Sequence, residues 1–71
     1  MACGNAYSPE QRARFDRLGQ IIVKTITGTP FEMAAIQEGF SPNDAKAALQ
    51  SDVKYMNPDA YKLIADKLGW E

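Results

Sequence analysis

The side chains best suited to recognition lie on one predicted helix, residues 42–55. The outward-facing residues of this helix are Asn43, Asp44, Lys46, Ala47, Gln50, Ser51 and Lys54. Asparagine and glutamine can pair with the edge of adenine, and lysine can neutralise phosphate, so these residue types fit contact with DNA. Their charges fit less well, because Lys46 and Lys54 are balanced by Asp44 and Asp52. A charge-balanced, alanine-rich face also suits packing against protein, and we favour protein narrowly over DNA.

Two further surfaces precede this helix. Arg12, Arg14 and Arg17 lie on a predicted first helix and can bind phosphate or an acidic patch on a partner; a solvated helix face explains them equally well. Residues 1–7 are expected to form a flexible arm in which Tyr7 anchors a partner. The alternative for Tyr7 is packing beside the start of the first helix.

The sequence offers little for catalysis. It contains no histidine and one cysteine, Cys3, with no base positioned to activate it, and its carboxylates are scattered rather than paired. Without histidine and with a single thiol, a zinc site is not expected either. We therefore predict a protein that is not an enzyme and needs no metal or cofactor.

Length and composition predict one small soluble domain. The 71 residues are 45% hydrophobic and 24% charged, which is ordinary for a globular chain and argues against disorder. The net charge is −1, whereas DNA-binding domains are usually basic. No apolar stretch approaches the length of a membrane span, so the expected location is the cytoplasm, and the expected oligomeric state is a monomer.

Four prolines mark four helix starts. Each follows a residue that can cap a helix: Ser8-Pro9, Thr29-Pro30, Ser41-Pro42 and Asn57-Pro58. Proline suits the first helical position, and the preceding side chain can accept a hydrogen bond from a free amide of the first turn. The predicted helices span residues 9–26, 30–38, 42–55 and 58–68. Gly28, Gly39 and Gly69 supply the stops.

The predicted fold class is all-α, with four short helices, a helix-turn-helix core in residues 8–71 and a loose arm before it. Apolar spacing assigns the following residues to the core: Phe15, Leu18, Ile22 and Ile26; Phe31, Met33, Ala34, Ala35 and Ile36; Ala45, Ala48, Leu49, Val53 and Met56; and Tyr61, Ile64, Ala65 and Leu68. Tyr55 and Met56 end the third helix, where they are also available to an interface.

A family resemblance rests on two stretches of the chain. Gln11, Arg12 and Phe15 in the first helix, followed by "AAIQEGFSPNDA" over residues 34–45, resemble the N-terminal helix-turn-helix region of phage small terminase subunits. The resemblance covers about residues 9–53. It implies that the turn is framed by Ala34, Ala35, Gly39, Phe40, Ser41 and Ala45, and that the outer face of the third helix is the recognition surface. Where that family commonly carries a basic residue before the turn, this chain has Gln37 and Glu38.

These observations predict a small phage-type regulator of transcription. Small phage proteins often act on host machinery, so the expected partner is host RNA polymerase or an associated factor, bound through protein–protein contacts in the host cytoplasm. The alternative is a helix-turn-helix DNA-binding protein, either terminase-like or a small repressor. A structural component of the virion remains a third class.

Overall fold

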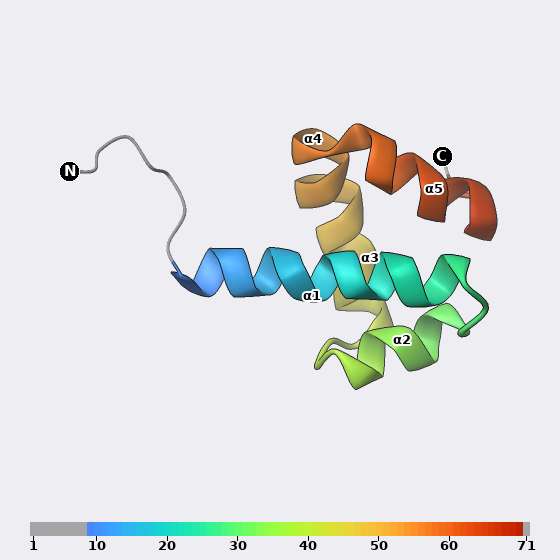
Figure 1. Cartoon of the computed structure of the whole chain (residues 1–71), viewed down its shortest axis with the longest axis horizontal. Helices are drawn as coiled ribbons and strands as arrows, with labels where there is room; N and C mark the ends of the chain where they lie inside the picture. The colour runs from blue at the N-terminus through green and yellow to red at the C-terminus, as the bar shows by residue number, and fades with distance from the viewer. Residues whose placement is uncertain (1–8, 71) are drawn as a thin grey trace.

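The computed structural model describes residues 9–70, and this part of the chain is built from helices alone (Figure 1). Helix α1 spans Pro9–Ile26 and is the longest. The other helices lie against its C-terminal half, so that its first turns project beyond them (Figure 1). The predicted all-α class with four helices is confirmed. The predicted arm with Tyr7, and the predicted cap at Ser8, lie outside the described residues.

Helix α1 passes into α2 (Phe31–Gln37) through a turn at Gly28, which has a φ of 124° that favours glycine. The predicted cap at Thr29 is wrong, because Pro30 itself holds the N-cap position in an extended conformation and no side chain caps the helix. Pro30 contributes its carbonyl instead, which accepts from the amide of Ala34 at 2.9 Å.

A tight turn joins α2 to α3 (Pro42–Ala48). Gly39 takes a φ of 88°, and the amide of Phe40 donates back to the carbonyl of Ala35 at 2.9 Å, which closes the end of α2. The hydroxyl of Ser41 then accepts from the amide of Asp44 at 3.2 Å, as its position before Pro42 predicted. This α2–turn–α3 unit is compatible with a helix-turn-helix, which stays a prediction.

The third predicted helix runs without a break over residues 42–56, but its middle is not α-helical. Helix α3 continues into a π-helical stretch, η1 (Leu49–Val53), and then into a single turn, α4 (Lys54–Met56). In η1 the amide of Lys54 donates to the carbonyl of Leu49, five residues back. Such a turn holds more residues than an α-turn and is frequently found at functional sites.

The last helix, α5 (Pro58–Leu68), begins and ends as predicted. The side chain of Asn57 accepts from the amide of Ala60 at 3.3 Å. Gly69 ends the helix with a φ of 78°, and the amide of Trp70 reaches back to the carbonyl of Ala65 at 2.8 Å.

The core lies between α1, the continuous helix 42–56, α2 and α5. Its buried members are Leu18, Ile21, Ile22, Ala34, Ala35, Ala45, Ala48, Leu49, Val53, Tyr61, Ile64 and Ala65. The alanines let α2 and α3 approach the other helices closely. Phe31, Tyr61 and Trp70 cluster at the edge of this core, with the Phe31 and Trp70 rings edge to face at 5.2 Å between centroids.

Four predicted core assignments are wrong. Ile26, Met33, Ile36 and Met56 are all exposed. On α1 the buried side extends through Thr25 rather than Ile26, because Thr25 continues the row of Leu18 and Ile21, seven and four residues before it. On α2 the small side chains of Ala34 and Ala35 face the core, which leaves the larger ones outside.

Candidate functional site

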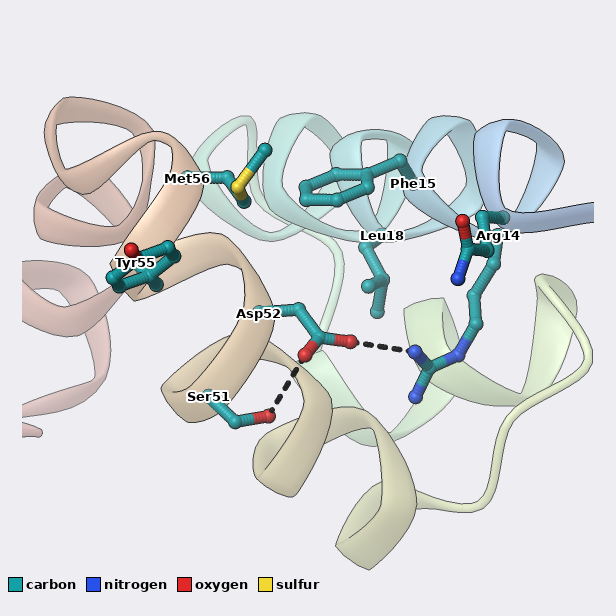
Figure 2. A pocket seen from close by; sticks show the side chains of 8 residues that line it. Arg14, Phe15, Leu18, Ser51, Asp52, Tyr55 and Met56 are labelled. Atoms are coloured by element: carbon teal, nitrogen blue, oxygen red, sulfur yellow. Dashed lines mark hydrogen bonds and ion pairs between the residues drawn. The ribbon is translucent and has the colours of Figure 1, made fainter. Parts of the chain in front are cut away.

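A groove of about 280 Å³ lies between the first half of α1 and the η1–α4 stretch (Figure 2). Its lining residues are Gln11, Arg14, Phe15, Leu18, Ser51, Asp52, Tyr55 and Met56. We call it the α1–η1 groove. Its volume falls just below the range of about 300–1,000 Å³ typical of small-molecule pockets, so it suits one or two inserted side chains better than a cofactor.

Helical periodicity explains the α1 wall of the groove. Gln11, Arg14, Phe15 and Leu18 are spaced by three and four residues and therefore share one side of the helix. Leu18 is fully buried at the bottom, whereas Phe15 is half-buried and Arg14 is exposed. The wall thus grades from apolar in the depth to charged at the rim.

The π-helical stretch shapes the opposite wall. Ser51 and Asp52 lie within η1, and Tyr55 and Met56 follow in α4. The added residue in this turn changes the direction in which the following side chains point, by about the 100° that each helical residue contributes. Figure 2 shows Met56 next to the ring of Phe15, whereas Tyr55 lies further from α1 at the outer edge of the groove lining.

One ion pair spans the groove. Arg14 Nη1 lies 2.5 Å from Asp52 Oδ2, and Figure 2 shows this contact linking the two walls. The Ser51 hydroxyl lies 3.3 Å from the other carboxylate oxygen of Asp52 and 2.8 Å from the carbonyl of Ala47. Both charged side chains are well exposed, so the pair contributes about 0–1 kcal/mol and orders the groove more than it stabilises the fold.

Tyr55 is the most exposed large hydrophobic side chain of the described residues, at 85%. Met56 beside it is 48% exposed. An aromatic ring and a flexible thioether next to an apolar hollow are the residue types that anchor protein–protein contacts.

The structure places the sequence-predicted residues on two surfaces. Arg14 lies in the groove, while Arg12 and Arg17 are exposed on α1 outside its lining. The predicted outer face of the third helix is accessible: Asn43, Asp44, Lys46, Ala47, Gln50 and Lys54 are all exposed.

The two lysines of that outer face turn toward aromatic rings. Lys46 Nζ lies 5.4 Å from the centroid of Trp70, and Lys54 Nζ lies 5.6 Å from the centroid of Tyr61. A cation over a ring gains about 0.5–1 kcal/mol at an exposed site. A phosphate would have to draw each lysine away from its ring.

Another basic residue is engaged inside the fold. Lys24 Nζ donates to Glu38 Oε2 at 2.7 Å and to Gln37 Oε1 at 3.0 Å. Gln37 and Glu38 are the residues that depart from the terminase pattern, and here they tie the end of α2 to α1. Both side chains accept hydrogen bonds from Lys24, whereas a basic side chain at either position would offer no acceptor and would repel the Lys24 ammonium.

Sequence reasoning did not assemble the α1–η1 groove. Phe15 was assigned to the core and Asp52 to a charge balance, and nothing in the spacing of residues 42–56 indicates a π-helical turn. The sequence does indicate Tyr55 and Met56, at the end of the third helix, as residues available to an interface, but it does not connect them with α1. The available signal was Tyr55 itself, a large aromatic residue that does not belong to the apolar pattern of the third helix and is therefore expected on its surface.

Within residues 9–70, no helix combines the length and apolarity needed to cross a bilayer, and no group of three metal-ligating side chains gathers. Comparison with protein-family models, curated proteins and solved structures finds no match. The geometry of the chain therefore carries the functional conclusion.

Proposed function

We propose that this protein is a non-enzymatic regulator that binds a partner protein through the α1–η1 groove, with Tyr55 as the anchor. The observation that supports this most is the 85% exposure of Tyr55 beside an apolar hollow formed by Phe15, Leu18 and Met56. Leaving a large aromatic side chain in water gains the monomer nothing, whereas burying it on a partner gives binding energy.

The charge arrangement favours protein over DNA as the partner. Arg14 is paired with Asp52, Lys24 with Glu38, and the lysines of the 42–56 helix lie over aromatic rings. DNA affinity depends on basic side chains that are free to neutralise phosphates. Here several of the basic groups already have partners within the chain.

The proposed class of target rests on the sequence resemblance and on the small size of the chain. Because residues 9–53 resemble a DNA-handling domain of phages, we place the partner in the host transcription machinery, as RNA polymerase or a factor associated with it. The protein would act in the host cytoplasm as a monomer, by occupying a surface that initiation or elongation requires.

Binding to purified host RNA polymerase in the absence of DNA tests this proposal directly. We expect a saturable complex whose affinity falls at least tenfold in Tyr55→Ala. Leu63→Ala is the matched control, because Leu63 is also exposed, at 55%, but lies on α5 outside the groove lining. Polymerase docking through this groove would be refuted if no complex forms, or if Tyr55→Ala and Leu63→Ala bind with equal affinity.

DNA binding is the second candidate, supported by the exposure of Asn43, Gln50 and Lys54 on the 42–56 helix together with Arg12 and Arg17 on α1. If this helix contacts DNA, the double variant Lys46→Glu/Lys54→Glu should abolish binding. The logarithm of the affinity should also fall with the logarithm of salt concentration, at about 0.9 per phosphate contacted. A shallow salt dependence, or an affinity unchanged in the double variant, argues against this candidate.

A further inference from the structure

We propose that a hollow between the starts of α2 and α3 and the end of α5 binds a proline-rich segment of a partner protein in the polyproline II conformation, with a basic residue of that segment on Glu32. The hollow has a volume of about 370 Å³ and shares no lining residue with the α1–η1 groove. We call it the Trp70 notch, and its apolar walls are Pro30, Phe31, Pro42, Leu68 and Trp70. The proposal does not depend on docking through the α1–η1 groove.

The aromatic wall of the notch is preformed. The rings of Phe31 and Trp70 are nearly perpendicular, at 87°, with 5.2 Å between their centroids. The amide of Trp70 donates to the carbonyl of Ala65, and the ammonium group of Lys46 lies over the indole ring. Two rings at a right angle form a corner into which the compact, rigid ring of a proline can pack, and a site that is already ordered loses little entropy on binding.

The notch is open to solvent, which suits a segment of chain better than an enclosed small molecule. Its polar lining residues, Glu32, Asn43 and Lys46, are exposed, and its two aromatic residues are half-buried. Small-molecule sites bury most of the surface of their ligand, and this lining cannot do so. A polyproline II segment lies across an aromatic surface and buries one side only.

Among the usual ways of recognising a peptide, the polyproline II mode fits this surface best. A strand added by a partner needs the edge of a sheet, and residues 9–70 contain no strand. A partner helix needs a long apolar groove, whereas the notch is bounded by the ends of three helices. A polyproline II segment has no internal hydrogen bonds, so its carbonyls need donors. The amide of Asn43 and the ammonium group of Lys46 supply such donors in the notch.

The charges of the notch favour a basic residue in the partner segment. Glu32 forms no ion pair within residues 9–70, and this includes Lys46, the other charged residue of the lining. The Lys46 ammonium lies 5.4 Å from the centroid of Trp70, where the ring stabilises its charge. The exposed carboxylate of Glu32 therefore remains available to an arginine or lysine of the partner.

The fluorescence of Trp70 tests the proposal without a label, because Trp70 is the one tryptophan of the chain. The probe is a synthetic peptide with proline at every third position and one arginine beside the first proline. We expect a saturable change in the emission of Trp70. A control peptide with alanine in place of every proline should give no saturable change. A second control with glutamate in place of the arginine should bind about tenfold more weakly.

Substitutions of exposed side chains test the roles of the polar lining without disturbing the core. Glu32→Gln should weaken binding of the arginine peptide about threefold and leave binding of a peptide with alanine in place of the arginine unchanged. Asn43→Ala should weaken binding of both peptides, because it removes a donor to the backbone. The matched controls are Asp66→Asn and Gln50→Ala, which are exposed and outside the lining and should bind both peptides as the native protein does.

The absence of a saturable change, or equal affinity for the proline and alanine peptides, would overturn the proposal. Equal affinity of Glu32→Gln and the native protein for the arginine peptide would overturn the role of Glu32. A single-stranded oligonucleotide that changes the emission of Trp70 when the peptide does not would show that the notch stacks bases instead. Tyr55→Ala should leave peptide binding unchanged, because Tyr55 lies outside the notch, so the failure of this site and the failure of the proposed docking groove are distinguished.

Discussion

Arg14 Nη1 and Asp52 Oδ2 lie 2.5 Å apart and connect the second turn of α1 to the π-helical stretch η1. A second ion pair, between Lys24 and Glu38 at 2.7 Å, connects the end of α1 to the end of α2. Both pairs tie α1 to a neighbour, but they differ in their exposure to water. This difference makes them a natural pair for comparison.

We expect the less exposed pair to contribute more to stability. The side chains of Arg14 and Asp52 are 51% and 40% exposed, against 31% and 18% for Lys24 and Glu38. Double-mutant cycles with alanine, measured by urea unfolding, should give a coupling of about 0.2–1 kcal/mol for Arg14–Asp52 and a larger one for Lys24–Glu38. A larger coupling for Arg14–Asp52 would mean that the groove is held more rigidly than exposure alone suggests.

Tyr55→Ala should separate binding from folding. Because the side chain is 85% exposed, its loss should change the free energy of unfolding by less than about 0.5 kcal/mol. At a partner interface the same truncation should cost about 2 kcal/mol, which is roughly thirtyfold in affinity. Unfolding curves and binding isotherms on the same preparation check both numbers. A destabilised fold with unchanged binding would show that Tyr55 is structural.

Two glycines should respond to alanine with opposite signs. Gly39 has a φ of 88°, so Gly39→Ala should destabilise the protein by about 1–2 kcal/mol through backbone strain alone, since nothing lies within 4 Å of the added methyl group. Gly19 lies inside α1 with equally free space, and Gly19→Ala should stabilise by about 0.5–1 kcal/mol. Thermal unfolding of both variants checks the signs, and a shift in the same direction for both would contradict the assigned turn.

Thr25→Val should stabilise the fold. The Thr25 hydroxyl is buried without a hydrogen-bond partner among the described residues, which costs about 1–3 kcal/mol, and valine keeps the shape while removing the polar atom. Thr27→Val is the control, because Thr27 is exposed and its hydroxyl donates to the carbonyl of Val23 at 2.7 Å. We expect about 1 kcal/mol of added stability for Thr25→Val, measured by chemical unfolding, and little change for the control. A loss of stability at Thr25 would reveal a hidden partner for the hydroxyl.

Local chemistry made much of the fold predictable from the sequence. Ser41 and Asn57 cap helices because each precedes a proline and can bond to an amide of the first turn, and both contacts are present. Gly39 and Gly69 stop helices because both positions need a positive φ. These rules involve neighbours within a few residues, and no knowledge of the packing is required to apply them.

The features that the sequence did not predict depend on packing between residues far apart in the chain. Thr25 rather than Ile26 is buried because the neighbouring helices cover that side of α1, and the apolarity of a residue does not reveal where they lie. The candidate site was harder still. Arg14 was identified by its charge, but Asp52 is 38 residues away, and only the folded chain brings the two together.

The π-helical turn at Leu49–Val53 carries a consequence for how this chain tolerates change in its length. Because each helical residue contributes about 100° of rotation and the wide turn absorbs one extra residue, deleting one exposed residue such as Gln50 would restore regular α-pitch and leave Tyr55 and Met56 pointing as they do now. A regular α-turn over the same number of residues would instead rotate both side chains by about 100°. A relative that lacks the wide turn therefore keeps this surface only if it is also one residue shorter there, and replacing side chains one at a time would not reveal that dependence.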